Sequence, residues 1–338
     1  MYYKIRKGIF SKPLYLRAVD GVSLDLDRGD TLALIGESGC GKTTLGMTAL
    51  RLLEPLGGKI TFYVRDGDEL LEEHPALKDF VVSSEGEVYC IDITHIPLKE
   101  LKWFRRRAQM IFQDPYSCLD PMHTIYHTLE EPLLVHGIGD REERYERVCK
   151  ALEMVKLTPT EDFIPKYPHM LSGGQMQRVN IARALILGPE FIIADEPVTM
   201  LDASVRVEIL MLLRELQKRE DIAFVYITHD MSTAKYFSHK AAIMYAGKIV
   251  ETGDFMRIVN EPTHPYTQAL IEVIPEPDPK NRFRERNVPP GEPPRLVNPP
   301  PGCRFAPRCP YAKDICRKEE PPFTEIKPGH SVACWLHV

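Results

Sequence analysis

The stretch LALIGESGCGKTTLGMTALRLL, residues 32–53, joins an apolar run to a helix-forming run through three closely spaced glycines. Its loop matches GxxxxGK[ST] in full, and the expected order of strand, loop and helix is the context that this motif requires. A chance glycine-rich turn is the alternative, and the correct context argues against it. The stretch therefore predicts a phosphate-binding loop in an α/β domain whose parallel sheet carries the ligand site at its edge.

Each residue type in this loop suits the binding of phosphate groups. The glycines let backbone N–H groups turn toward a β-phosphate, and a helix beginning near Lys42 adds the positive end of its dipole. Lys42 is expected to reach the β- and γ-phosphates, and Thr43 to ligate Mg²⁺. The candidate nucleotide-binding residues of the loop are Gly36, Ser38, Gly39, Cys40, Gly41, Lys42, Thr43 and Thr44.

A second apolar run, FIIADEP at residues 191–197, ends in two acidic residues. Its continuous apolar character predicts a strand buried on both faces of a parallel sheet, so the acids emerge at the carboxyl end, where ligands bind. Asp195 is expected to hold Mg²⁺, and Glu196 to orient or deprotonate the attacking water. Acidic residues often simply end strands, so the prediction depends on the complete phosphate loop upstream.

Two further apolar runs end in polar residues. IAFVYITHD, residues 222–230, delivers His229 and Asp230 to the same sheet edge. His229 can contact a γ-phosphate or hold the water and Glu196 in register, and capping of the following helix is an equal alternative. Gln113, after the short run that begins at Gln109, can reach Mg²⁺ or the water, although a glutamine at a strand end is more often only exposed.

The stretch LSGGQMQRVNIARAL, residues 171–185, places a serine and two glycines in front of a helix expected from about Gln175. A hydroxyl, close backbone N–H groups and a helix N-terminus together suit a phosphate. No lysine or aspartate follows to complete a nucleotide site. The sequence therefore predicts half of a phosphate site.

Taken in order, GESGCGKTT, FQDP, LSGGQ, FIIADEP and ITHD resemble the motifs of the ATP-binding subunit of an ABC transporter. The resemblance implies a P-loop NTPase fold with a RecA-like parallel sheet core, an antiparallel β-subdomain and an α-helical subdomain. It also implies that two subunits pack head to tail, so that each LSGGQ caps the ATP held by the other. The residues that would do this are Ser172, Gly173, Gly174 and Gln175.

The same resemblance assigns roles to single positions. Lys42 and Thr43 are similar to the Walker A residues, and Asp195 to the Walker B metal ligand. The implied catalytic residues are Glu196, His229, Gln113 and Lys42, and the implied Mg²⁺ ligands are Thr43, Gln113 and Asp195. In VTMLDAS, residues 198–204, Asp202 matches the D-loop, where Thr199 and Met200 replace the usual Ser-Ala. Tyr15 is the candidate for stacking on adenine, and Phe10 is the alternative.

Composition changes near residue 260, since 17 of the 29 prolines and four of the eight cysteines lie beyond it. We therefore expect an ABC ATPase domain over residues 1–260 and a Pro/Cys-rich extension over 261–338. Within the first, the helical subdomain is expected at about 114–170. An insertion at about 60–96 is longer than the short hairpin of related chains and is expected to enlarge the antiparallel β-subdomain.

The extension closely resembles that of the dipeptide/oligopeptide permease ATPases, a group that also includes nickel and some oligosaccharide importers. Its cysteines are spaced C-x5-C-x6-C-x17-C. Disulfides are not expected in the cytosol, and the C-x2–4-C pairs of structural zinc sites are absent. Four thiolates can ligate a [4Fe-4S] cluster, and some members of the group carry one, so a cluster, zinc and free thiols all stay open for Cys303, Cys309, Cys316 and Cys334.

Length and charge limit the alternatives. No apolar run approaches the roughly 20 residues that cross a bilayer, and the first residues lack the apolar core of a signal peptide. We expect a peripheral chain at the cytoplasmic face of the membrane. Its implied partners are a second ABC ATPase subunit, identical or homologous, two transmembrane permease subunits and, indirectly, an extracytoplasmic substrate-binding protein.

Two other functions are alternatives to transport. A soluble ABC ATPase acting on nucleic acid would need a basic face, whereas the net charge is −5 and the basic run at residues 102–107 is short. The other is an iron-sulfur redox sensor with a vestigial ATPase. The transport function, powered by ATP with Mg²⁺, explains more of the motifs, and the cargo stays open among peptide, nickel and oligosaccharide.

Overall fold

The computed structural model describes residues 1–5, 14–272 and 297–338. These residues form two compact units. Unit 1 contains Met1 and Leu45–Ile192, and unit 2 contains Tyr2–Thr44 and Ile193–Val338. Phe10, the alternative adenine-stacking residue, lies outside the described residues. After Tyr2 the chain passes twice between the units, once within the first helix after the phosphate loop and once within the strand that leads to Asp195.

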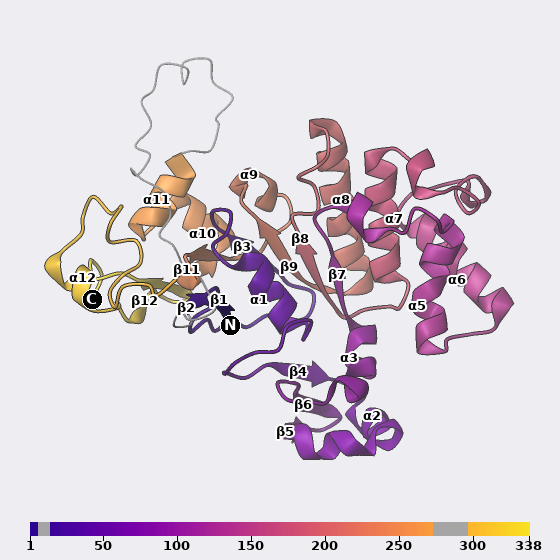
Figure 1. The fold of residues 1–338 in the computed structure, drawn as a ribbon, viewed down its shortest axis with the longest axis horizontal. Helices are drawn as coiled ribbons and strands as arrows, with labels where there is room; N and C mark the ends of the chain where they lie inside the picture. Colours follow the sequence, from indigo (N-terminus) through magenta and orange to yellow (C-terminus); the bar gives the residue numbers. More distant parts are fainter. Residues whose placement is uncertain (6–13, 273–296) are drawn as a thin grey trace. The chain divides into compact units, whose positions relative to one another are not determined.

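Unit 2 is built on a mixed sheet with the strand order β12-β13-β11-β10-β3-β9-β8 (Figure 1). Its strands are β3 (Thr31–Ile35), β8 (Phe191–Asp195), β9 (Ala223–Thr228), β10 (Lys240–Tyr245), β11 (Lys248–Asp254), β12 (Phe323–Lys327) and β13 (His330–Ala333), with β1 (Tyr2–Ile5) and β2 (Leu14–Arg17) as a separate antiparallel pair. Its helices are α8 (Ala203–Glu220), α9 (Met231–Ala234), α10 (Phe255–Asn260), α11 (Pro265–Glu272) and α12 (Asp314–Lys318). It also holds the start of α1 (Lys42–Ala49), which continues into unit 1 at Leu45.

The central strands of unit 2 are apolar because both faces of the sheet are covered. All five residues of β3 are buried, and β3 pairs in parallel with both β10 and β9. Parallel strands end at a common edge, so the loops that follow β3 and β9 emerge there together. This is the edge that the sequence predicts for ligand binding.

Unit 1 holds the remaining elements in the described ranges, and its first part is the predicted insertion. There, β4 (Thr61–Val64), β5 (Val81–Glu85) and β6 (Val88–Asp92) form an antiparallel sheet of order β4-β6-β5. The rest comprises α2 (Gly67–Glu73), α3 (Lys102–Arg107), β7 (Ala108–Ile111), α4 (Pro115–Cys118), α5 (Ile125–His136), α6 (Arg141–Met154), α7 (Gly173–Leu185) and the 3₁₀ helices η1 (Pro75–Phe80), η2 (Leu98–Leu101), η3 (Thr160–Asp162) and η4 (Pro168–Met170).

An arginine ties the insertion to the rest of unit 1. Arg107, the last residue of α3, donates to Asp66 in the insertion and, over 2.8 Å, to Glu190 just before β8. The Arg107 guanidinium beside it holds the pKa of the Asp66 carboxyl below its usual range. The insertion is thus a folded part of unit 1 and carries its own antiparallel sheet.

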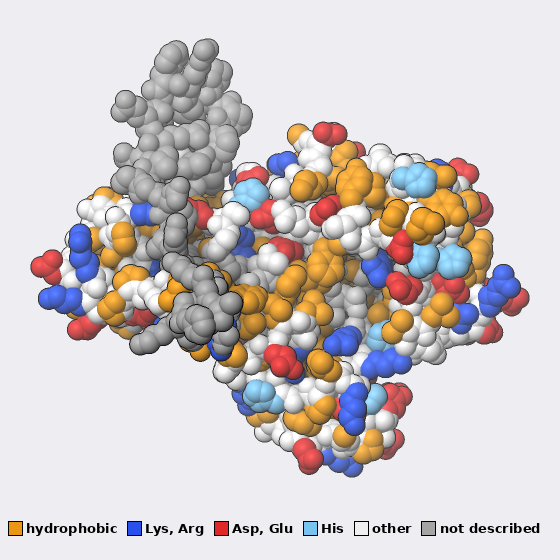
Figure 2. All heavy atoms as spheres, in the orientation of Figure 1, with side chains coloured by type: hydrophobic (Ala, Val, Ile, Leu, Met, Phe, Trp, Pro, Cys, Tyr) orange, Lys and Arg blue, Asp and Glu red, His pale blue; other side chains and the backbone are white. Residues whose placement is uncertain are grey.

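The described residues contain no helix that could span a membrane, and the face drawn in Figure 2 carries charges of both signs. Among residues 1–5, 14–272 and 297–338, no helix combines the length and the apolar character that crossing a membrane requires. On the face shown in Figure 2, Lys and Arg side chains are interspersed with Asp and Glu. This mixture agrees with the modest net charge of −5.

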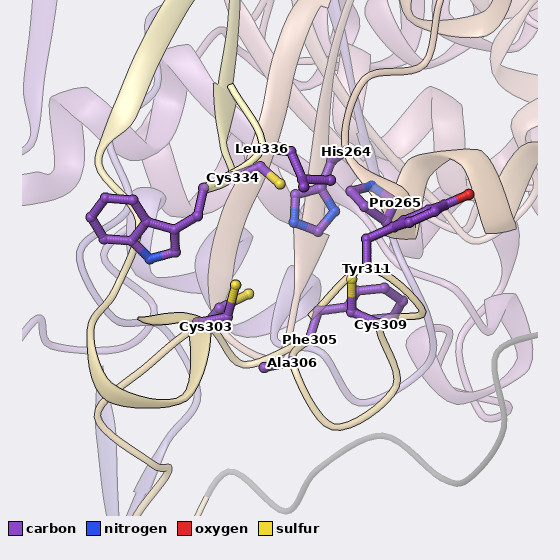
Figure 3. Close-up of a pocket in the computed structure, with 11 residues that line it drawn as sticks. His264, Pro265, Cys303, Phe305, Ala306, Cys309, Tyr311, Cys334 and Leu336 are labelled. Carbon is purple, nitrogen blue, oxygen red and sulfur yellow. The ribbon is translucent and has the colours of Figure 1, made fainter. Parts of the chain in front are cut away.

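The C-terminal extension continues the sheet of unit 2. Strand β13 pairs antiparallel with β11, and β12 pairs with β13. Phe305 and Val332 are buried, so the proline-rich segment contributes side chains to a core. Its four cysteines line one small cavity, and Figure 3 shows the sulfur atoms of three of them pointing into it.

A buried carboxylate fastens the extension to β11. Glu251 is 0% exposed, and its two oxygens accept hydrogen bonds of 2.9 Å from the backbone N–H groups of Thr263 and His264. His330 of β13 places Nε2 2.8 Å from the same carboxylate. Burying a carboxylate without such partners would destabilise the fold. The three contacts therefore make the burial of Glu251 possible.

Candidate functional site

The phosphate loop follows β3 as predicted, and α1 begins at Lys42. Two glycines are required by their surroundings. A Cβ on Gly36 would lie 2.1 Å from the carbonyl oxygen of Met244, and Gly41, at φ +108°, would place a Cβ 2.0 Å from the carbonyl oxygen of Ala18. Only glycine fits such close approaches of backbone to backbone. The loop is therefore held between two neighbouring segments of unit 2.

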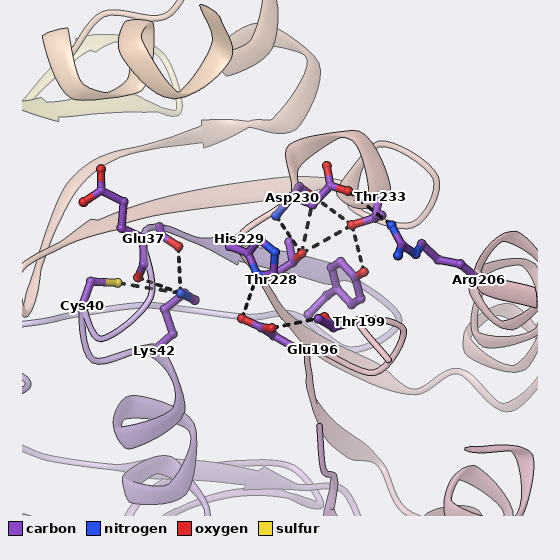
Figure 4. Close-up of polar contacts among 12 residues, drawn as sticks. Glu37, Cys40, Lys42, Glu196, Thr199, Arg206, Thr228, His229, Asp230 and Thr233 are labelled. Atoms are coloured by element: carbon purple, nitrogen blue, oxygen red, sulfur yellow. Dashed lines mark hydrogen bonds and ion pairs between the residues drawn. The ribbon is translucent and has the colours of Figure 1, made fainter. Parts of the chain in front are cut away.

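Lys42 lies inside the loop that it is predicted to serve. Its side chain is buried, and Nζ donates to the carbonyl oxygens of Gly36, at 2.8 Å, and Glu37, at 3.0 Å (Figure 4). These hydrogen bonds to carbonyl oxygens satisfy the buried ammonium group. A phosphate entering the loop would offer Lys42 charged oxygens in their place.

The structure brings the two predicted Mg²⁺ ligands of unit 2 together. Asp195, at the end of β8, is buried, and it accepts a hydrogen bond from the Thr43 hydroxyl. Burial raises the pKa of the Asp195 carboxyl above its ordinary value, and the Thr43 hydrogen bond opposes this shift. A carboxylate and a hydroxyl held this closely are oxygen ligands of the kind that Mg²⁺ takes in phosphate-binding sites.

Glu196 and His229 form a hydrogen-bonded pair. Glu196 Oε1 lies 3.0 Å from His229 Nδ1, and Oε2 accepts from the Thr199 hydroxyl at 3.1 Å (Figure 4). Glu196 adopts φ +44°, an uncommon conformation for a residue with a side chain. Its backbone N–H donates to Ile227 of the neighbouring strand over 2.9 Å. The strained backbone and the two side-chain partners fix the carboxylate at the sheet edge.

The contact of His229 with Glu196 favours one of the two roles predicted for this histidine. Asp230, and not His229, caps α9, since its side chain accepts from the backbone N–H of Ser232. His229 is half-exposed at the sheet edge and contacts Glu196. This geometry favours the role of orienting the carboxylate.

Thr199 is a site residue that sequence reasoning missed. The sequence marks Thr199 only as a departure from the usual D-loop, whereas its hydroxyl donates a hydrogen bond to the Glu196 carboxylate. Leu201 is buried and Asp202 is exposed at the start of α8, where its side chain makes no cap hydrogen bond. The exposed side chain of Asp202 is thus accessible to a partner.

The LSGGQ segment, residues 171–175, is called the signature from here on, and it lies in unit 1 at the start of α7. Ser172 accepts a hydrogen bond of 3.3 Å from the Gln175 N–H, and its own N–H donates to Gln175 Oε1 over 3.1 Å. This capping box starts the helix at Gly173, so the predicted start near Gln175 is wrong by two residues. Ser172 is exposed, and the first turn presents the N–H groups of Gly173 and Gly174 at a helix N-terminus.

The other two predicted nucleotide contacts are exposed side chains. Gln113 follows β7 in unit 1, where its side chain is exposed at the strand end. Tyr15 lies on β2 in unit 2 and is 45% exposed.

The four C-terminal cysteines are free thiols with similar surroundings. The sulfur of Cys303 accepts hydrogen bonds from the backbone N–H groups of Phe305 and Ala306. The sulfur of Cys309 accepts one from the backbone of Tyr311, and that of Cys334 one from the backbone of Leu336. Burial raises the pKa of the Cys303 thiol to about 11, so it is neutral at physiological pH. Within the described ranges, no three His, Cys, Asp or Glu side chains are arranged around a point that could hold a single metal ion.

Comparison with known families matches both parts of the chain. Residues 19–199 match the model described as "ABC transporter", and residues 250–316 match "Oligopeptide/dipeptide transporter, C-terminal region". The first match spans the phosphate loop, the signature and the acids after β8.

The chain belongs to the ABC transporter family. The oligopeptide transport ATP-binding protein AppF of Bacillus subtilis is 41% identical over 99% of this chain and 94% of the relative. The dipeptide transport ATP-binding protein DppF of Haemophilus influenzae is 40% identical over 99% and 93%. These matches confirm the predicted family, and ATP hydrolysis is the activity that it implies.

Solved structures confirm the predicted ABC ATPase fold. A dimeric post-hydrolysis structure of an ATP-binding cassette with bound ADP and Pi is 27% identical, with a TM-score of 0.58 over 75% of this chain and 96% of that one. The ABC ATPase described here therefore carries the expected core.

Proposed function

We propose that this ABC ATPase binds and hydrolyses ATP to power an importer of dipeptides or oligopeptides. The observation that carries the proposal is the arrangement at the sheet edge of unit 2, where the phosphate loop, the Thr43–Asp195 pair and the Glu196–His229 pair occur together. The match of residues 250–316 to the peptide-transporter C-terminal region supports the cargo class, as do the names of the full-length relatives.

The proposed roles follow from what each side chain can reach. Lys42 would leave the loop carbonyls for the β- and γ-phosphates, while Thr43 and Asp195 hold Mg²⁺. Glu196 would accept a proton from the attacking water, and His229 would keep that carboxylate aligned. Gln113 is proposed to contact Mg²⁺ or the water, and Tyr15 to stack on adenine.

We further propose that a second subunit completes the nucleotide-binding site. The first turn of α7 offers a hydroxyl and backbone N–H groups but carries no lysine, so it suits a γ-phosphate bound elsewhere. The similar cassette whose structure holds ADP and Pi is described as dimeric. ATP would close two such subunits, hydrolysis would reopen them, and each state would favour a different conformation of two permease subunits.

The proposed setting is the cytoplasmic face of the membrane, where the permease subunits would hold the chain as a peripheral subunit. An extracytoplasmic binding protein would deliver cargo to the other side. Nucleic acid is not a proposed partner, because the net charge is −5 and acidic side chains lie among the basic ones on the face shown in Figure 2. Nickel and oligosaccharide cargo have no support from the relatives named above, whose names specify peptides.

Import itself can be tested in cells whose growth depends on peptides as an amino-acid source. We expect growth to be lost without this chain and restored by it, but not by Lys42→Ala, which cannot hold the phosphates. Lys99→Ala, at an exposed position in η2, is the matched control. Peptide-dependent growth restored by Lys42→Ala at equal protein level would contradict the proposal, and loss of nickel uptake alone would indicate the other cargo.

A [4Fe-4S] cluster is proposed for the cavity of the extension. The donor set fits, because four thiols line one cavity and each of their sulfurs accepts at least one backbone N–H hydrogen bond, which stabilises a thiolate. The walls are apolar, with Phe305 and Leu336 among the lining residues. A cluster spreads its thiolates over separate iron atoms, so it does not need three ligands around one point. When bound, it would supply a cross-link within the extension.

The cluster can be tested by anaerobic purification. We expect absorbance at about 400 nm and about four iron and four sulfide per chain. Cys309→Ser should lose both signals, whereas Cys149→Ser, on α6, should keep them. Zinc in about one equivalent without colour would support the zinc alternative, and neither metal would leave free thiols.

A further inference from the structure

The C-terminal extension contacts one residue of the phosphate loop from two directions. Arg308 Nη1 lies 3.1 and 3.0 Å from the two carboxylate oxygens of Glu37. The hydroxyl of Tyr266 on α11 accepts a hydrogen bond of 2.9 Å from the backbone N–H of Glu37. Both the side chain and the backbone of this loop residue are therefore held by residues far away in the sequence, and all three lie in unit 2.

Glu37 in turn holds the lysine of the loop. Its carbonyl oxygen accepts from Lys42 Nζ at 3.0 Å, beside the 2.8 Å bond to Gly36. The contacts run from Arg308 and Tyr266, through Glu37, to Lys42 without a gap. A shift of Glu37 would therefore move one of the two carbonyls that set the resting position of the ammonium group.

Arg308 is held in place by its own surroundings. It is 9% exposed, and its guanidinium lies 5.9 Å from the ring centre of Tyr245 and 6.0 Å from that of Phe305. Phe305 also packs against Tyr266, with ring centres 5.5 Å apart. An exposed ion pair contributes little because its side chains are free to move, but this arginine is confined by aromatic rings before it reaches Glu37.

We propose that Arg308 and Tyr266 are positioning residues for the phosphate loop, acting through Glu37. They hold the start of the loop in the conformation that receives phosphate and fix the position from which Lys42 turns to the nucleotide. A loop ordered in advance loses less conformational freedom when the ligand binds, so the expected benefit is tighter ATP binding. The inference rests on the proposed nucleotide site.

The test compares ATP affinity and turnover in purified full-length variants. Arg308→Gln should raise the Kd and KM for ATP about tenfold, the size expected when a charged hydrogen bond is lost, with kcat changed less than about twofold. Arg308→Lys keeps the charge and should recover part of the affinity. Tyr266→Phe should also raise KM, and Arg317→Gln, at an exposed position on α12, should leave both constants unchanged.

A double-mutant cycle separates the contact from a general loss of fold. Glu37→Gln alters only the loop side of the pair and should raise KM as Arg308→Gln does, while the double variant should be no worse than either single one. If Arg308→Gln does not fold, the KM of Glu37→Gln for ATP alone still tests the positioning role. An unchanged KM in Glu37→Gln, or fully additive effects, would overturn the positioning role. Failure of the unmodified chain to bind ATP would overturn the proposed function and this inference together.

Discussion

Replacing Glu196 by Gln is expected to lower ATP turnover about 10²- to 10⁴-fold, the range for loss of a positioned general base. The amide keeps the shape of the carboxylate and can still contact His229 and Thr199, which lie 3.0 and 3.1 Å from its oxygens. Only the capacity to accept a proton from water is lost. ATP binding should therefore remain, and ATP should hold two subunits together in a form that size-exclusion chromatography detects.

The control for this variant is a substitution of a neighbouring residue that leaves the Glu196 carboxylate in place. Thr199→Val removes the hydroxyl contact but leaves the carboxylate, so turnover should fall by much less than in Glu196→Gln. If Glu196→Gln hydrolyses ATP at the rate of the unmodified chain, Glu196 is not the base. A redox-dependent change in partner binding alongside that result would favour the sensor with a vestigial ATPase.

Two complementary variants are expected to show that the signature acts on the partner's nucleotide. Gly174→Asp places a negative charge at the first turn of α7 and should abolish turnover by repelling the γ-phosphate, while its own phosphate loop still binds ATP. Lys42→Ala should lose ATP binding but keep an intact signature. An equal mixture of the two should recover about a quarter of normal turnover in a freely exchanging symmetric dimer.

The recovery follows from counting sites. Half of the dimers in that mixture pair one variant with the other, and each of these contains one site with an intact loop and an intact signature. Each variant alone, measured at the same total concentration, is the control. If Gly174→Asp alone keeps normal turnover, the signature has no part in hydrolysis. If it loses ATP binding in the isolated subunit, the signature serves its own chain.

The central part of the site could be predicted from the sequence because its geometry is local. Lys42 follows the apolar strand β3 through the phosphate loop, Asp195 ends β8 and His229 follows β9 directly. Strands of a parallel sheet end at one edge. The strand patterns therefore indicated which side chains meet. The Glu196–His229 contact and the Thr43–Asp195 contact both result from this arrangement.

The contacts that could not be predicted join distant parts of the chain. Glu37 and Tyr266 are 229 positions apart, and Glu37 and Arg308 are 271 apart. No local periodicity indicates that an arginine in a proline-rich segment will reach a phosphate loop. Thr199 was missed for a different reason, since a D-loop threonine looked like a mild substitution and its hydroxyl partner depends on the φ of Glu196.

Glu251 and the pairing of β13 on β11 make the extension inseparable from the ATPase core. A chain shortened after residue 260 would lose the backbone donors at Thr263 and His264 as well as His330, so a carboxylate beneath the surface would face no partner. It would also present the open edge of β11 to other molecules, which is a recognised route to self-association. The described part of the extension thus shields both a buried carboxylate and the edge of a strand in unit 2.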